Sequence, residues 1–280
     1  MERCIAEEQL QEFGRDLREE EREASTIEKY QRDIRQFVRW LKEQPLSKEL
    51  AVRWKESLIE TGYHPATVNS MLSALNRFFR FLGREDCRVK YLRVQRRIFR
   101  STEKELTREE YFRLLDTAQQ KGRERLALLM ETICATGIRV SEVKYITVSA
   151  VEKGSTEIAL KGKVRTILIP GKLCRKLKKY ARKQKIASGE IFLTKSGKGL
   201  SRMQIWAEMK SVCKEAKVAR TKVFPHNLRH LFAQTFYRVY RDIAKLADVL
   251  GHSSIETTRI YLVSTGNDHA RQLEHLGLLC

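Results

Sequence analysis

The sequence predicts a mainly α-helical protein that carries one small β-hairpin or sheet and divides into two domains. Apolar side chains recur at helical spacing up to residue 82, and a basic segment without a helical period follows them. Beyond that segment, two short runs of strand-forming residues flank a Lys-Gly-Lys turn. We therefore expect a helical bundle at 1–86, a basic linker at 87–103 and a mixed α+β domain at 104–280, each domain with its own core.

The N-terminal domain is predicted to be a bundle of four helices, at 3–19, 25–44, 48–60 and 65–82. Ser25 and Glu28 have the spacing of a capping box, which begins the second helix, and Pro45 ends it. Pro65 begins the fourth helix and Gly83 ends it. One face of that helix is apolar and consists of Val68, Met71, Leu72, Leu75, Phe78, Phe79 and Leu82.

The charge balance favours a polyanionic partner. Lysine and arginine number 55 against 35 acidic residues, which gives a net charge of +20. Such an excess is typical of proteins that bind nucleic acid or an anionic membrane surface. No apolar stretch approaches the roughly 20 residues that cross a bilayer, and the first residues lack the order of a signal peptide. We therefore expect a nucleic-acid partner, no membrane association and a cytoplasmic location.

The predicted linker between the domains is strongly basic. From Arg88 to Arg100 it has six basic residues and no acidic one. Like charges this dense repel each other unless a polyanion lies nearby, so we favour a strap that follows DNA phosphates. The alternative is a solvated charged loop. The candidate DNA contacts in the strap are Arg93, Arg96, Arg97 and Arg100.

The second domain is predicted to begin with a helix that Thr107 and Glu110 cap. Residues 156–169 are expected to form two strands around the turn Lys161-Gly162-Lys163. The helix at 172–185 has eight basic residues and no acidic one, so its outer face is strongly positive. Further helices are predicted at 124–135, 201–216, 225–240, 241–250, 254–263 and 268–279.

Two arginines, two histidines and a tyrosine form the pattern that indicates chemistry. Arg139 follows Ala-Thr-Gly-Ile, and His226 and Arg229 lie in Pro-His-Asn-Leu-Arg-His, on the first turn of one helix. His252 lies in Leu-Gly-His-Ser-Ser, and Tyr261 is expected about two turns along the helix that follows. Guanidinium groups hold phosphate oxygens through paired hydrogen bonds, histidines move protons, and a tyrosine is a covalent nucleophile. These residue types suit attack on a phosphodiester.

Such an attack needs no metal ion, since preorganised guanidinium groups stabilise the charge that builds on the phosphate. The sequence has no Gly-rich Walker-type loop and no acidic cluster that suggests magnesium. Its six cysteines occur singly, without a Cys-x-x-Cys pair, so a zinc site and a disulfide framework are not expected. We therefore expect no metal and no cofactor. A lone histidine is usually structural, and His64, His230, His269 and His275 are assigned to that class.

The chain resembles the tyrosine recombinase family, which includes phage integrases, Xer-type recombinases and conjugative-transposon integrases. The resemblance covers nearly the whole chain and rests on the three motifs Ala-Thr-Gly-Ile-Arg-Val-Ser-Glu, Pro-His-Asn-Leu-Arg-His and Leu-Gly-His-Ser-Ser-Ile-Glu-Thr-Thr-Arg-Ile-Tyr. It implies a SAM-like core-binding domain before a tyrosine-recombinase catalytic domain. Together the two would form a C-shaped clamp on double-stranded DNA.

The resemblance also implies a role for each motif residue. Arg139 and Arg229 would clamp the scissile phosphate, His226 would take the proton of Tyr261, and His252 would hydrogen-bond the phosphate. Tyr261 would attack and form a 3′-phosphotyrosyl enzyme with a free 5′-hydroxyl. The family has a lysine in the hairpin turn that protonates the leaving oxygen. We favour Lys163 for this role, with Lys161 as the alternative acid or as a DNA contact.

The tail after Tyr261 has an apolar face and by resemblance would dock on a neighbouring protomer, giving a homotetramer on two duplexes. Packing against its own domain is the alternative. For the biological role, the stretches 172–185 and 224–240 favour a mobile element, because they look closer to transposon-borne recombinases. The expected lack of an arm-binding domain favours Xer-type dimer resolution instead. A type IB topoisomerase-like relaxase and a non-catalytic DNA-binding protein are the remaining alternatives.

Overall fold

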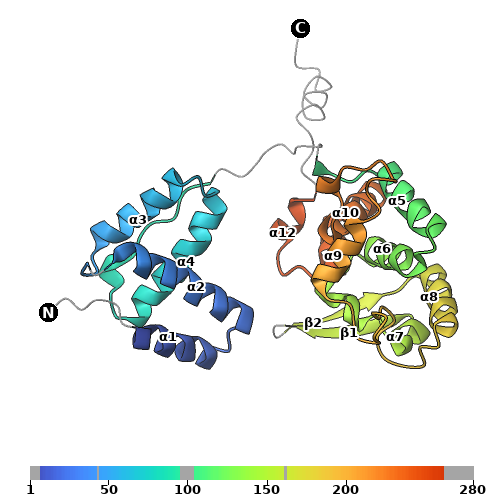
Figure 1. Cartoon of the computed structure of the whole chain (residues 1–280), viewed down its shortest axis with the longest axis horizontal. Coiled ribbons are helices and arrows are strands. Elements are labelled where there is room, and N and C mark those ends of the chain that lie inside the picture. The colour runs from blue at the N-terminus through green and yellow to red at the C-terminus, as the bar shows by residue number, and fades with distance from the viewer. Residues whose placement is uncertain (1–6, 43, 95–103, 161–162, 262–280) are drawn as a thin grey trace, which may run out of the picture. The chain divides into compact units, whose positions relative to one another are not determined.

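The computed structural model describes residues 7–42, 44–94, 104–160 and 163–261, except for the side chains of Leu160 and Lys163. The chain divides into two compact units, Met1–Arg96 and Arg97–Cys280, and each is described by itself (Figure 1). Helices dominate both units, and the described strands form one two-stranded sheet. The predicted fold class, mainly α with a small β-hairpin, is confirmed. Among the described helices, none is long and apolar enough to span a bilayer.

The first unit is the predicted four-helix bundle. Helix α4 (Pro65–Phe81) packs against each of the other three, α1 (Glu7–Glu19), α2 (Ala24–Leu41) and α3 (Lys48–Glu60). Aromatic rings fill the centre, where the edge of Phe13 meets Phe78 and Phe37 contacts both Trp54 and Phe79. Rings of this size dominate the energy of a core, because each removes a large apolar area from water. The helical spacing of these residues therefore fixes the bundle.

The starts of the helices show which local signals form as predicted. Pro65 occupies the first turn of α4, and the His64 ring accepts a hydrogen bond from the backbone of Ala66, so His64 is structural as expected. The Thr107 capping box forms as well, with both reciprocal hydrogen bonds in place. The predicted Ser25 box is wrong. Helix α2 begins one residue earlier, after Glu23, because the backbone amides of Thr26 and Ile27 bond to the Glu23 carbonyl.

The start of the basic segment is tied to the bundle. After the short helix η1 (Glu85–Cys87), Val89 is buried and exchanges two hydrogen bonds with the Asn76 side chain, at 2.9 and 3.0 Å. Leu92 makes the same exchange with Asn69. Arg93 is exposed directly after this anchor. The other predicted DNA contacts of the segment, Arg96, Arg97 and Arg100, lie outside the described residues.

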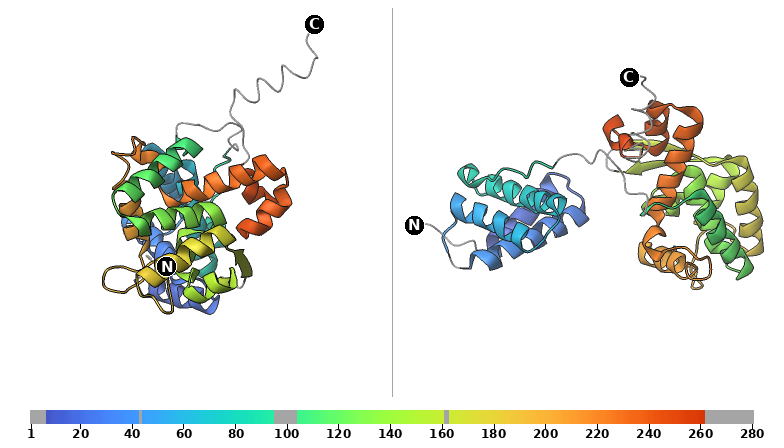
Figure 2. Two further views of the ribbon diagram at one scale, coloured as in Figure 1. Left: turned by 90° about the vertical axis from the view of Figure 1, so that its right-hand side faces the viewer. Right: turned by 90° about the horizontal axis from the view of Figure 1, so that it is seen from above.

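The second unit is built around α6 (Glu124–Thr136), which packs against α5 (Arg108–Gln120), α8 (Gly171–Lys183) and α10 (Pro225–Tyr240) (Figures 1 and 2). Helix α7 (Val148–Lys153) leads into strand β1 (Ser155–Leu160), which pairs antiparallel with β2 (Lys163–Leu168) in the register Ser155↔Leu168 to Leu160↔Lys163. The remaining described elements are η3 (Val140–Tyr145), α9 (Arg202–Lys210), η4 (Arg220–Lys222), α11 (Ile243–Leu250) and α12 (Ile255–Arg259).

Two helices of this unit are shorter than predicted. Helix α9 ends at Lys210 and the chain continues in turns to residue 217, where a helix to 216 was expected. Helix α12 ends at Arg259, so Tyr261 follows the helix instead of lying within it. The backbone amide of Tyr261 bonds to the Thr258 carbonyl at 3.0 Å, a turn that folds the tyrosine back towards α10. The predicted helix at 268–279 lies outside the described residues.

Candidate active site

The end of α6 brings the first motif close to α10. Gly137 ends the helix in the left-handed conformation, with φ of 64°. A Cβ atom at this position would collide with the Phe232 ring of α10, so only glycine allows the close approach. Two residues later, the Arg139 guanidinium donates to the buried Glu142 carboxylate at 3.0 Å, and its backbone amide donates to the same carboxylate at 2.8 Å. Arg139 is nevertheless 44% exposed.

Arg229 is buried at the centre of the site. Its side chain, 3% exposed, comes from the first turns of α10 and donates to the carbonyl of Gly137 and, at 2.9 Å, to that of Leu250. It therefore joins the ends of α6, α10 and α11. Burial lowers the pKa of Arg229, and the positive charge of Arg139 lowers it further, while a hydrogen bond with Tyr261 acts in the opposite direction.

The hydrogen bonds of His252 fix its tautomer. The Arg229 Nη2 atom lies 2.8 Å from His252 Nε2, and a guanidinium can only donate, so Nε2 accepts. The proton of the neutral ring is therefore on Nδ1, which donates to Thr258 Oγ1 at 2.9 Å. Burial, followed by the charges of Arg229, Arg139 and Arg165, lowers the pKa of His252 to about 4. In this state the imidazole is neutral at physiological pH.

Tyr261 is buried among three histidines. Only 3% of it is exposed, and its ring stacks on His252 at a centroid separation of 5.8 Å. The ring centroid of His226 lies 6.1 Å away, and that of His230 lies at 4.7 Å in an edge-to-face contact. His226 is exposed to solvent. His230, predicted to be structural, does pack, but against the candidate nucleophile.

The hairpin brings one arginine side chain to the site. The backbone of Lys163, the first residue of β2, pairs with Leu160, and the Lys163 side chain lies outside the described part of the chain. Lys161 lies outside the described residues. Two residues after Lys163, Arg165 points back into the site, where its Nη2 atom lies 3.4 Å from Glu142 Oε2 and its Nη1 atom donates to the Leu250 carbonyl. The hairpin is thus joined to the other elements of the site.

Sequence reasoning singled out neither Arg165 nor Glu142 as a residue of the site. Glu142 ends the Arg-Val-Ser-Glu motif, which was the available signal, and it is 1% exposed. No spacing in the sequence indicates Arg165. Within the described residues, these two and the motif arginines place three guanidinium groups around one carboxylate. The site is therefore strongly positive before any ligand arrives.

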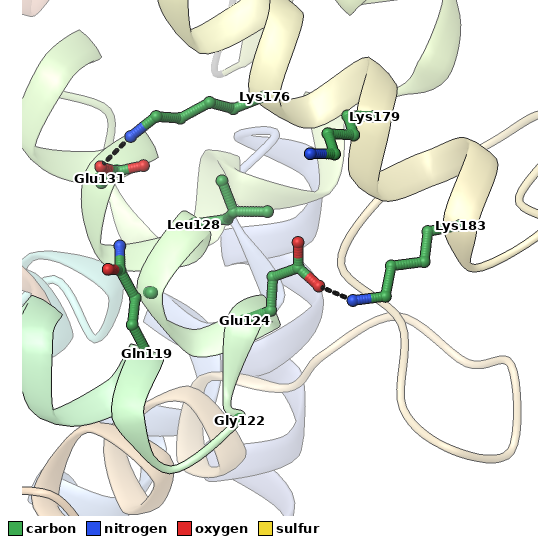
Figure 3. Close-up of a pocket in the computed structure, with 9 residues that line it drawn as sticks. Gln119, Gly122, Glu124, Leu128, Glu131, Lys176, Lys179 and Lys183 are labelled. Atoms are coloured by element: carbon green, nitrogen blue, oxygen red, sulfur yellow. Dashed lines mark hydrogen bonds and ion pairs between the residues drawn. The ribbon is translucent and has the colours of Figure 1, made fainter.

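A separate pocket lies between α5, α6 and α8, away from these residues. Lysines of α8 line one wall, where Lys176 pairs with Glu131 and Lys183 with Glu124 (Figure 3). None of the predicted catalytic residues lines it. Helix α6 contacts both α8 and α10 and lies between their labels in Figure 1. The predicted catalytic residues therefore lie in the arginine and histidine cluster and not in this hollow.

Comparison with known proteins identifies the family. The phage integrase family model matches residues 104–267, and the phage integrase N-terminal SAM-like domain matches residues 10–86. The chain belongs to the phage integrase family. Tyrosine recombinase XerA of Pyrococcus furiosus is 31% identical to this family member over 288 residues, which cover 99% of this chain and 97% of the relative. Tyrosine recombinase XerD of Halalkalibacterium halodurans is 28% identical, over 85% of this chain and 86% of the relative.

Solved structures share the fold of this phage integrase family member. A lambda integrase dimer bound to a core site has a TM-score of 0.72 at 18% identity, over 91% of this chain and 94% of that one. The Tn1549 transposon integrase in complex with circular intermediate DNA has a TM-score of 0.71 at 18% identity, over 95% and 98%. The expected family is confirmed, and the protein is a tyrosine-type site-specific recombinase.

Proposed function

We propose that this recombinase cuts and rejoins double-stranded DNA through a covalent bond between Tyr261 and a 3′-phosphate. The observation that carries the proposal is the position of Tyr261, buried against His252 and His230, near His226, and hydrogen-bonded to Arg229. The phenol, an imidazole that can take its proton, and a guanidinium that can hold the phosphate therefore lie in one place. Together these groups supply a nucleophile, a base and an anion site.

The reaction follows from these groups. The Tyr261 oxygen attacks the phosphorus as its proton passes to His226, and Arg139 and Arg229 hold the non-bridging oxygens, where negative charge builds. The bond between phosphorus and the 5′-oxygen breaks, and a lysine of the hairpin gives that oxygen a proton. Lys163 is the proposed donor and Lys161 the alternative. Attack by another 5′-hydroxyl reverses the step, so strands are rejoined without an external energy source.

His252 is proposed to change protonation state when the phosphate binds. Its Nε2 atom accepts from Arg229 in the free site and so has no proton to offer a phosphate oxygen, which is itself an acceptor. A phosphodiester brings a negative charge that favours the imidazolium form. Once Nε2 is protonated, His252 can donate to the phosphate while Nδ1 keeps its bond to Thr258.

Double-stranded DNA is the proposed partner and a tetramer on two duplexes the proposed assembly. The net charge of +20 supports a polyanionic partner. Among proteins of the same fold, one solved structure is a lambda integrase tetramer bound to a Holliday junction, with a TM-score of 0.72. We propose that residues 1–86 bind the core site and that residues 104–280 form the catalytic domain with a docking tail. The linker at 87–103 is proposed to follow the DNA phosphates. The proposed DNA contacts are Arg93, Arg96, Arg97 and Arg100 of the linker and Lys161 of the hairpin. A cytoplasmic location of the protein is likewise proposed.

For the biological role, we propose integration or excision of a mobile element. The fold shared with the Tn1549 transposon integrase supports this role. The match to XerA over 97% of that relative favours a second candidate, the resolution of chromosome or plasmid dimers. DNA sequence around the coding region distinguishes the two, because an element has paired ends close to its integrase gene. Relaxation of a plasmid that lacks any recombination site would instead indicate a topoisomerase-like enzyme.

The central test is a duplex with a nick near the cleaved bond, from which a short 5′-ended strand diffuses away and traps the covalent complex. Wild-type protein should give a protein–DNA band on a denaturing gel. Tyr261→Phe should give none, a loss of more than about 1,000-fold, while DNA affinity stays within about twofold because one hydroxyl adds little to phosphate contacts. A covalent band from the Phe variant would show that another residue is the nucleophile.

A further inference from the structure

We propose that Arg165 is a positioning residue, which fixes the two phosphate-binding arginines relative to each other and to the hairpin. It lies on β2 opposite Ile158, two residues after Lys163, and its side chain is 11% exposed. The inference rests on the proposed function, because it assumes that Arg139 and Arg229 hold the scissile phosphate. It adds a residue to which neither the motifs nor the family comparison assigns a role.

Both polar contacts of Arg165 are with groups that also hold the motif arginines. Its Nη1 atom donates to the Leu250 carbonyl, which accepts a second bond from Arg229 at 2.9 Å. Its Nη2 atom lies 3.4 Å from Glu142, the carboxylate that receives the Arg139 guanidinium at 3.0 Å. Arg165 therefore contacts one group that binds Arg229 and one group that binds Arg139. Removing its side chain would take a polar contact away from the Leu250 carbonyl and from Glu142 at the same time.

Gly251 shows that the chain makes room for this side chain. The residue has a φ of 63°, and a Cβ atom there would collide with the aliphatic part of Arg165. Arg165 thus packs directly on the turn between Leu250 and His252. Its position therefore affects the backbone that carries His252 as well as the carbonyl that binds Arg229.

The contacts of Arg165 are poor for a residue that serves stability alone. Its Nε and Nη2 atoms are buried and have no hydrogen-bond partner. Burial lowers the pKa of Arg165 to about 10, against the effect of Glu142, and the charges of Arg229 and Arg139 add to the lowering. Burying a charge with unsatisfied donors costs free energy that an apolar side chain of similar size would avoid. We infer that the charge is retained for the site, where it shares Glu142 and so leaves Arg139 free to bind phosphate.

Arg125 provides a matched control. It also lies in the second unit, donates to a backbone carbonyl, that of Leu193, and pairs with a carboxylate, Glu208. Its side chain is 26% exposed, and none of its contacts is with a site residue. Arg165→Met and Arg125→Met therefore remove the same kind of interaction from inside and outside the site.

The experiment measures covalent cleavage of the nicked duplex at saturating DNA, together with DNA affinity and thermal unfolding. Arg165→Met should slow cleavage by about 10- to 100-fold, because a small misplacement of a clamp has effects of this size. Affinity should change by less than about threefold, and Arg125→Met should cleave at the wild-type rate. A substrate with sulfur at the leaving 5′-position needs no proton donor, so the Arg165→Met defect should remain on it.

Three outcomes would overturn the inference. Cleavage by Arg165→Met as fast as by Arg125→Met would show that the residue has no role in the site. Full rescue by the sulfur substrate would show that it acts through the proton donor instead of the clamp. If Arg165→Met does not fold, Arg165→Lys is the deciding variant, because lysine keeps the charge but cannot contact both Glu142 and the Leu250 carbonyl. A wild-type cleavage rate from a folded Lys variant would reject the positioning role. If wild-type protein forms no covalent band, the proposed function itself has failed.

Discussion

Arginine is used in opposite ways in the two units of this protein. In the bundle, Arg77 of α4 is 14% exposed and pairs with both Asp16 and Glu20 of α1. One guanidinium has two carboxylates there. Although burial acts to lower its pKa, the bonds and charges of Glu20 and Asp16 raise the pKa of Arg77 above its usual value. The two carboxylates outweigh the positive charge of this arginine, which joins two helices even though its Nε atom is buried without a hydrogen-bond partner.

In the candidate active site, guanidinium groups outnumber carboxylates. Arg139, Arg165 and Arg229 lie around the single carboxylate of Glu142, and the pKa values of both Arg165 and Arg229 are lowered. The backbone carbonyls of Gly137 and Leu250 satisfy donors but carry no full negative charge. The difference between the two regions is that positive charge exceeds negative charge at the candidate active site, as a site that binds an anion requires. A phosphodiester would supply that anion.

The strongest test of this comparison removes one arginine from each region. Arg229→Met should slow covalent cleavage by about 100-fold or more, because a preorganised donor to the transition state is lost. Arg77→Met should leave cleavage within about twofold but lower the free energy of unfolding by about 1–2 kcal/mol, since its partners are partly exposed. The rate of covalent-complex formation on the nicked duplex measures the first effect, and thermal unfolding measures the second. Equal losses of cleavage in both variants would contradict the distinction between a structural and a functional arginine.

The hairpin lysines sharpen the comparison, because they add positive charge with a different task. Lys163→Ala should slow cleavage of ordinary DNA by about 100-fold. A 5′-thiol leaving group has a much lower pKa than an alcohol and should restore most of the rate. The same pair of substrates with Lys161→Ala decides which lysine is the proton donor. If sulfur rescues neither variant, the donor does not lie in this turn.

The smallest expected effect concerns His252 and pH. Its pKa is about 4 in the folded protein, below the ordinary value of 6.5, so between these values the unfolded chain binds a proton that the folded chain does not. The stability that neutral His252 contributes is present above pH 6.5 and is lost as the pH falls towards 4. In DNA-free protein, the unfolding temperature should therefore fall more steeply from pH 7 to pH 5 for wild type than for His252→Asn. Parallel curves would mean that the imidazole is not held neutral.

Much of the fold could be predicted from the sequence, because the signals are local. The apolar face of α4 and the antiparallel pairing of β1 with β2 follow from spacings of a few residues. The error at Ser25 is also local, since two adjacent starts compete for one helix and the backbone bonds to Glu23 decide. The motif residues pointed to phosphate chemistry because their types are rare in combination.

Only the tertiary structure decided how those residues meet. The helix expected to hold Tyr261 ends before it, and a turn brings the tyrosine ring against His230. This contact joins residues 31 positions apart, so no local pattern in the sequence could indicate it. The sequence by itself determined which residues can carry charge, exchange protons or act as a nucleophile, because those properties belong to the side chains. It could not determine that Arg165, Glu142 and the Leu250 carbonyl converge, because that depends on how α6, β2, α10 and α11 pack.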